Sequence, residues 1–416
     1  MFCRSLWRWL PDVSAVCAAA ALCAVIIGLA DEAAGVEPTT VEISTPLPYG
    51  PAPINYFSET DDDLVKRLQV RLDDGSLKLT SQPGSGYLLD LLRVLQVPME
   101  SQVLVFSKTS LNQSLIRPTT PRAIYFNDDV TVGWVHDSAA IEIAIQNPDK
   151  GTLFYTLPQP AAADTIGDEA NPPTLRFRRD GRCTACHISA RTLHVPGHIV
   201  SSYLTDTTGA PREGYSTINH TTPFPHRWGG WYATGQTPGL VHWGNLIGEK
   251  EAARHKIEPA FRGTSNAIDS AVDLTRYPSR HSDVVALLVL NHQLHFYNLV
   301  NRVSFEFRLN RRSDAEEQLI RYALMQDEAP LVEPVTGSTK FAEVYQQSGP
   351  DGAVRELRKL DLKARTFQHA LSPLIASRSF QSLPEPVKTR LYEQLDTELA
   401  RRPDRSAHEL LRKLRE

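Results

Sequence analysis

The chain has 416 residues, of which 41% are hydrophobic and 22% are charged, and it carries a formal net charge of -4. This length accommodates two or three ordinary domains, or one large domain with insertions. The composition is that of a globular protein, and the slightly acidic balance argues against a broad surface for nucleic acid. We therefore expect no nucleic-acid partner.

The first 30 residues have the pattern of an export segment. Arg4 and Arg8 precede an apolar run from Val13 to Ala30, after which acidic and small residues follow. A basic start, an apolar centre and small residues near the end are typical of a secretory signal peptide. Because about 18 apolar residues just span a bilayer, an uncleaved membrane anchor is the alternative. Both interpretations predict a periplasmic or otherwise exported protein, soluble or anchored through residues 1–30.

Residues 31–165 are predicted to form an N-terminal α+β region. The spacing of apolar residues predicts short helices over residues 61–72 and 86–95. Val103–Phe106 begins a strand-rich stretch, and four further segments separated by turn residues predict a meander of about four strands. These are RAIYF, TVGWV, AIEIAI and TLFYTL, which lie between Arg122 and Leu157.

Residues 166–250 are predicted to be a cofactor-binding region, because they contain the sequence CTACH. Three of the five cysteines lie in the export segment, so Cys183 and Cys186 are the only two thiols of the exported body. C-x-x-C-H is the pattern of covalent haem attachment, in which two thiols form thioethers and the histidine binds the iron. We therefore predict one haem c, held by Cys183 and Cys186, with His187 as the proximal ligand.

Two alternatives to haem remain at this motif. The two cysteines together with His194 and His198 resemble a zinc site, but the gap from Cys186 to His194 is shorter than that pattern requires. A Pro-Gly pair between the two histidines also breaks the helix that would place them on one face. The second alternative is a plain disulfide, which an oxidising compartment allows.

Arginines surround the motif: Arg176, Arg178, Arg179, Arg182 and Arg191. A guanidinium group pairs bidentately with a carboxylate, so one or two of them are candidates to hold haem propionates. We select Arg182 as the cofactor-binding candidate of this group. The alternatives are a solvated basic loop or a docking patch for an acidic partner.

Residues 199–250 are rich in Gly, Pro and aromatic residues and are expected to form few regular elements. Trp228, Trp231, Tyr232 and Trp243 are candidates for the walls of a haem pocket, with core packing as the alternative for each. Trp228 and its neighbour Arg227 are the cofactor-binding candidates that we select in this segment.

Residues 251–416 have a helical pattern. Residues 281–307 are predicted to form one long helix with a single apolar face, and His292 lies on that face. Further helices are predicted over residues 314–325, 341–347, 353–360, 360–371 and 384–402. The predicted fold class is thus α+β, with the haem between a strand-rich N-terminal region and a mainly helical C-terminal region.

Several blocks occur in combination: PRAIYFNDDVTVGWV, CTACHISARTLHVPG, HRWGGWYATG and HWGN. Together they resemble an uncharacterised family of exported bacterial cytochrome c domain-containing proteins, over most of the chain from about Arg122 onward. The resemblance implies haem binding and lends no settled activity. In that family the segment matching HWGN tends to carry Met where this chain has Trp243, and a cysteine often found in the segment matching HALSPLIAS is absent here.

The sixth iron ligand decides what a bound haem does. Of the histidines, His242 is the first candidate because its Gly-rich aromatic segment can approach a haem face, and His292 is the second. Met99 and Met325 are the methionines of the exported body, and neither lies in an evident ligand loop. The iron ligands that we select are therefore His187 and His242.

We expect one-electron transfer with a redox partner protein, because a second strong ligand gives a low-spin carrier. The first alternative is a haem enzyme of peroxidase or oxidase type, with Arg227, His226 and His242 at an open distal site. The second is a haem-based sensor or binding module. A simple carrier needs only about 100 residues, so the size of this chain suggests an additional task.

Overall fold

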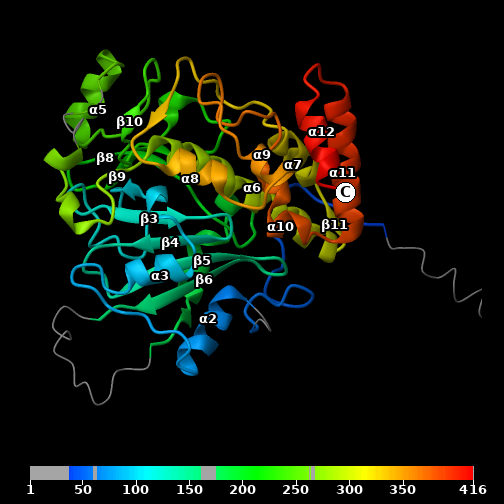
Figure 1. The fold of residues 1–416 in the computed structure, drawn as a ribbon, viewed down its shortest axis with the longest axis horizontal. Coiled ribbons are helices and arrows are strands. Elements are labelled where there is room, and N and C mark those ends of the chain that lie inside the picture. The colour runs from blue at the N-terminus through cyan, green and yellow to red at the C-terminus, as the bar shows by residue number, and fades with distance from the viewer. Residues whose placement is uncertain (1–36, 60–62, 161–174, 262, 264–267, 416) are drawn as a thin grey trace, which may run out of the picture. The chain divides into compact units, whose positions relative to one another are not determined.

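A six-stranded antiparallel sheet dominates the N-terminal half of the computed structural model (Figure 1). Its strands follow one another in chain order, with the pairing β2-β3-β4-β5-β6-β7. The bounds are β2 (Val103–Val105), β3 (Arg122–Phe126), β4 (Val130–Trp134), β5 (Ala140–Asn147), β6 (Gly151–Pro158) and β7 (Arg178–Arg179). The predicted strands are confirmed as a meander, because short runs of apolar, β-branched and aromatic residues specify the strands and Asn- and Asp-containing turns specify their connections.

The structure describes residues 37–59, 63–160, 175–261, 263 and 268–415. The export segment predicted for residues 1–30 lies outside these ranges. Within them, residues 40–415 belong to one compact unit. No helix of the described ranges is both long enough and apolar enough to cross a bilayer.

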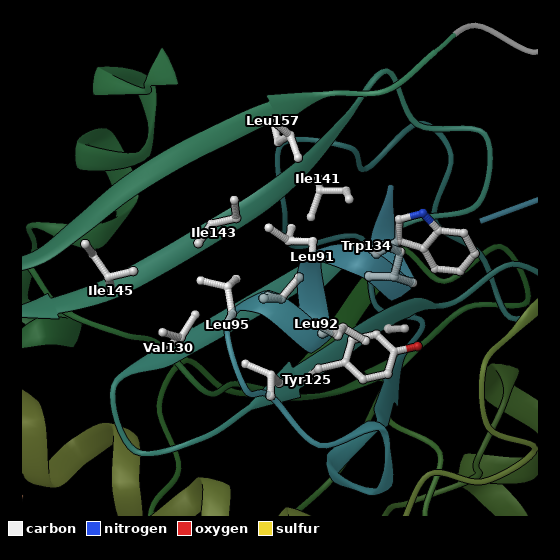
Figure 2. Packing of buried hydrophobic residues seen from close by; sticks show 14 of the residues in the cluster. Leu91, Leu92, Leu95, Tyr125, Val130, Trp134, Ile141, Ile143, Ile145 and Leu157 are labelled. Atoms are coloured by element: carbon white, nitrogen blue, oxygen red, sulfur yellow. The ribbon is translucent and has the colours of Figure 1, made fainter. Parts of the chain in front are cut away.

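One face of the sheet packs against α3 (Leu88–Val94). Figure 2 shows Leu91, Leu92 and Leu95 directed toward a layer of sheet side chains. The sheet residues of this layer include Tyr125, Val130, Trp134, Ile141, Ile143, Ile145 and Leu157, and all of them are buried. Because side chains alternate between the two faces of a strand, these positions have the same parity in the ladder.

The opposite face of the sheet carries polar residues as well as apolar ones. Ile124 and Phe126 of β3 pack in the cluster that contains the first half of α6. Further along the same face lie Glu142, Gln146 and Phe154, as the strand register requires. This second half of the face is the surface that receives the segment containing CTACH.

The long helix α6 (Val284–Arg308) lies against β2 and β6 on one side and against α7, α8 and α10 on others. Asp283 caps its N-terminus by accepting hydrogen bonds from the N–H groups of Val285 and Ala286. The predicted helix is confirmed, but the prediction of a single apolar face is wrong. Every residue from Val284 to Leu294 is buried, because neighbouring elements cover the helix on all sides.

Apart from the short α4 (Thr184–His187) of the CTACH segment, the remaining described α-helices are α2 (Leu64–Asp73), α5 (Gly248–Ile257), α7 (Ala315–Ala323), α8 (Phe341–Gln347), α9 (Ala353–Leu357), α10 (Arg378–Gln381), α11 (Glu385–Ala400) and α12 (Ser406–Lys413). Short strands pair outside the main sheet: β8 (Ser202–Thr205) with β9 (Pro211–Tyr215), and β10 (Gly235–Gln236) with β12 (Thr336–Gly337). Two further short strands are β1 (Thr39–Thr40) and β11 (Arg311–Arg312). The α+β prediction is confirmed, with a mainly helical C-terminal part.

The helix predicted over residues 360–371 is wrong. The carboxylate of Asp361 accepts hydrogen bonds from the N–H groups of Lys363, Ala364 and Arg365, and Leu362 has a positive φ of 54°. An Asp side chain that binds nearby backbone N–H groups offers an alternative to helical hydrogen bonding. The segment therefore forms a turn, which a bridge between Leu360 and Phe367 closes.

The contact between α3 and the sheet gives a stability prediction. Leu91 is completely buried, whereas Leu111 is 48% exposed. We expect Leu91→Ala to lower the free energy of unfolding by about 2–5 kcal/mol, because it removes buried methyl groups and leaves a cavity. Leu111→Ala is the matched control and is expected to change it by less than about 1 kcal/mol. Chemical denaturation of both variants measures the difference, and equal effects would contradict the described packing.

Candidate haem attachment site

The residues of CTACH form one short helical turn. A 3-10 turn (Gly181–Cys183) runs directly into α4 (Thr184–His187). The carboxylate of Asp180 starts the turn by accepting a hydrogen bond from the N–H of Arg182 at 3.0 Å. Residues three apart on a helix lie on the same side, so the turn brings the Cys183 and Cys186 side chains together.

The two thiols are unpaired and both are accessible to solvent to some degree. Cys183 is half-buried and Cys186 is exposed. Burial, together with the nearby charges of Asp180 and Glu142, raises the pKa of the Cys183 thiol to about 12. Reactive cysteines of thiol–disulfide enzymes have lowered pKa values, so this environment argues against a redox-active C-x-x-C pair.

The imidazole of His187 has a defined tautomer. Its Nδ1 lies 2.8 Å from the carbonyl oxygen of Gly197, which can only accept, so Nδ1 carries the proton. In the neutral ring the lone pair is then on Nε2, the atom that binds metal when Nδ1 donates to a carbonyl. Burial lowers the pKa of His187 to about 4, and the ring packs 4.7 Å from that of Phe154. His187 is thus neutral, oriented and able to act as a ligand through Nε2.

The peptide groups on both sides of the Gly197 carbonyl are held by α6. Asn298 accepts a hydrogen bond from the N–H of His198 and donates one to its carbonyl, both at 2.8 Å. Asn301 donates to the carbonyl of Pro196 at 3.0 Å. A Cβ at Gly197 would overlap Oδ1 of Asn298, so this close approach requires glycine.

The alternative zinc arrangement is not assembled. Nε2 of His198 lies 2.7 Å from the amide nitrogen of Gln146, on the sheet, and burial lowers the pKa of His198 to about 3. His194 is half-buried and has a left-handed backbone with φ 57°. Among the residues that the structure describes, no three His, Cys, Asp or Glu side chains are grouped as a metal site.

Two arginines near the motif form ion pairs, Arg176 and Arg182, and Arg182 is the more exposed of the two. Its side chain is 75% exposed and pairs with Asp180 at 2.6 Å. Arg179 is committed elsewhere, since it donates to the carbonyls of Tyr56 and Ser58 and lies over the Tyr56 ring. Arg182 therefore lies beside the thiols, where a propionate would have to compete with Asp180.

Arg227 and Trp228 lie in a different buried cluster. Arg227 is 1% exposed and donates to the carbonyls of Thr222 and His220, both at 2.6 Å. Trp228 is completely buried and donates from its indole nitrogen to Asn291 on α6 at 2.9 Å. These contacts give both side chains a structural role in the core. None of their hydrogen-bond partners belongs to the CTACH segment.

His242 belongs to the same cluster, with its ring 4.9 Å from that of Trp228. Its Nδ1 accepts a hydrogen bond from the N–H of Gly244 at 3.1 Å, so the proton is on Nε2, which lies 3.2 Å from Thr237 Oγ1. As an iron ligand, His242 would have to leave these contacts. The second candidate, His292, is also engaged at both ring nitrogens, by Ser372 and by His220.

Sequence reasoning missed the residues that support the motif, namely Gln146, Phe154, Gly197 and Asn298. Gln146 and Phe154 were detectable in principle, because both have the opposite parity to the apolar positions of β5 and β6. Asn298 is a polar residue inside a helix that is otherwise buried among apolar neighbours. Such a residue indicates a specific hydrogen bond, although the sequence does not reveal its partner.

Comparisons with known proteins give no identification. No protein-family model matches the chain, and neither the curated proteins nor the solved structures contain a match.

The support from α6 can be tested by amide hydrogen exchange. Asn298→Ala removes both hydrogen bonds to the His198 backbone, and we expect the opening free energy at the Gly197 and His198 amides to fall by about 1–3 kcal/mol. Amides of the β4–β5 hairpin serve as an internal control and should keep their protection. Unchanged exchange at Gly197 and His198 would show that α6 does not hold this segment.

Proposed function

We propose that this chain is an exported protein that carries one covalently attached haem c and transfers single electrons. The main support is the arrangement of CTACH: two thiols and a neutral imidazole on one helical turn, with the imidazole lone pair on Nε2. The predicted export segment agrees with this proposal, because haem c is attached outside the cytoplasm. So does the resemblance to exported cytochrome c domain-containing proteins.

The attachment chemistry fits the state of the thiols. Cys183 and Cys186 would hold the porphyrin: each S–H would add across one vinyl C=C bond, with the sulfur on one carbon and the hydrogen on its neighbour. The addition is redox-neutral for the protein and needs two thiols that are free and reachable. Cys183 and Cys186 are both free, and the exposed position of Cys186 leaves room for a group at the surface.

The neighbours of His187 suit a proximal ligand. When bound, a haem supplies an iron that alternates between the ferric and ferrous states. The hydrogen bond from Nδ1 of His187 to Gly197 makes Nε2 more basic and fixes the plane of the ring. The ring of Phe154 supports the imidazole from the sheet side. Because Cys186 is exposed, a group attached to this turn would be accessible to a redox partner protein.

Electron transfer is favoured over haem enzymology by the state of the candidate distal residues. Arg227 would have to supply the positive charge of an open distal site, but it is buried and donates to two backbone carbonyls. His242 is occupied at both ring nitrogens in the same cluster. Two of the three candidate acid–base and cationic groups for peroxidase chemistry are therefore engaged in core contacts, whereas Nδ1 of His226 has no hydrogen-bond partner among the described residues.

Covalent attachment is the first test. The full chain is exported together with c-haem maturation machinery, purified and denatured in alkaline pyridine. We expect haem to stay with the wild-type polypeptide, and to be lost from the Cys183→Ala/Cys186→Ala double variant because no thioether can form.

The matched control is Ala185→Ser, which changes an exposed residue between the two cysteines and keeps both thiols. It should retain haem like the wild type. Extraction of haem from the wild-type chain, or a double variant that keeps it, would refute the attachment proposal.

The ligand assignment is tested by substituting histidines in the attached form. We expect His187→Ala to keep covalent haem but to change the spin state and the midpoint potential, because the proximal nitrogen is removed. His194→Ala, in the same loop, is the control and should leave both unchanged. An unaltered absorption spectrum and potential for His187→Ala would remove His187 as a ligand.

The same assay tests His242 as the sixth ligand. If His242 binds the iron, His242→Ala converts a low-spin spectrum into a high-spin one. An unchanged spectrum would show that His242 is not an iron ligand and that its role is structural, through its hydrogen bonds to Gly244 and Thr237.

A further inference from the structure

A pocket of about 590 Å³ lies apart from the CTACH turn. It is enclosed by the end of α3, the turn between β3 and β4, the middle of α6, and the segment from α8 to the end of α9. Phe126, Phe341 and Tyr345 form buried aromatic walls. A volume of this order is typical of sites for small organic molecules.

The pocket is preformed. The side chain of Asn127 donates to the carbonyl of Leu95 at 3.0 Å and accepts from the N–H groups of Asp129 and Val130. Its backbone carbonyl accepts from Gln293 of α6 at 2.7 Å. The turn that carries the acidic side chains is thereby fixed to both α3 and α6.

The cations that line the pocket already have carboxylate partners. Arg358 is 5% exposed, pairs with Asp128, and has its guanidinium carbon 4.9 Å from the centre of the Tyr345 ring. Arg93 is mostly exposed and lies 3.6 Å from Asp90. Neither guanidinium is left to balance another acidic group in the pocket.

Two polar groups of the lining lack partners. The carboxylate of Asp129 makes no hydrogen bond or ion pair within the part of the chain that the structure describes, and burial raises its pKa, with only a partial opposing effect from Arg378. Nε of Arg358 is buried and has no acceptor there either. Asp129 is half-buried, whereas Nε of Arg358 is fully buried. A polar group that is withdrawn from water without a partner is costly, so a ligand that supplies one gains affinity.

We propose that this pocket binds a small organic amine with an apolar, aromatic-sized body, its ammonium group paired with Asp129. The aromatic walls would receive the body, and aromatic rings also attract a cation. An oxygen on the same molecule would accept a hydrogen bond from Nε of Arg358. A carboxylate ligand fits less well, because Asp128 and Asp129 both border the pocket while both arginines are already paired.

Isothermal titration of the purified full chain tests this proposal at neutral pH with three probes of similar shape: phenethylamine, phenethyl alcohol and phenylacetate. We expect phenethylamine to bind, and the neutral and anionic probes to bind at least tenfold more weakly. Asp129→Asn should weaken phenethylamine binding by roughly tenfold to a hundredfold, because a charge-assisted hydrogen bond is lost.

The matched control is Asp327→Asn, which makes the same charge change in a separate, smaller cavity and should leave binding unchanged. Val344→Trp, which fills the pocket from α8, should abolish it, and circular dichroism verifies that each variant is folded. The proposal is overturned if phenethylamine does not bind, if phenylacetate binds more tightly, or if folded Asp129→Asn and Val344→Trp bind the amine like the wild type.

Discussion

The set of hydrogen bonds from the second half of α6 to the loop after CTACH is the constraint on which the candidate site depends. Asn298 holds both backbone groups of His198, Asn301 holds the carbonyl of Pro196, and Arg302 holds the carbonyl of Leu193. Arg302 is fully buried and is paired with Glu306 at 2.6 Å. Removing one partner of such a pair costs about 3–5 kcal/mol, so the pair fixes where the arginine donates. The orientation of His187 therefore derives from a helix more than 90 positions further along the chain.

The strands and their order were predictable because the physical signals are local. Each strand from β3 to β6 is a short run rich in apolar, β-branched or aromatic residues, and turn-forming Asn and Asp residues separate the strands. The motif CTACH was equally evident, since the pattern that predicts haem attachment consists of five consecutive residues. The helix α6 was detectable from its length and its apolar content, but its burial on all sides was not, because that depends on neighbours far away in sequence.

The surroundings of the motif could not be predicted for the same reason. Trp228 and Arg227 are aromatic and cationic, as a haem pocket would need, yet their partners are Asn291 and the carbonyls of Thr222 and His220. A sequence gives the chemical type of a side chain and not the direction in which it points. The turn at Asp361 illustrates a second limit, because the local apolar pattern favoured a helix while one carboxylate bound three backbone N–H groups instead.

The size of the chain can be related to the two regions that α6 supports. An electron carrier needs about 100 residues, and the turn with its immediate supports on β5, β6 and α6 would meet that need. The first half of α6 instead serves the other cluster and the pocket lined by Asp129 and Arg358. The same helix thus supports the loop that orients His187, through Asn298, and lines the pocket, through Gln293. Asn298 and Gln293 are five positions apart, which is about 7.5 Å along the helix axis. Gln293 and Asn298 thus anchor two different segments, the turn at Asn127 and the loop at His198, to the same helix. The proposed haem and the proposed small-molecule site would share this one helix, which would account for a body larger than a carrier needs.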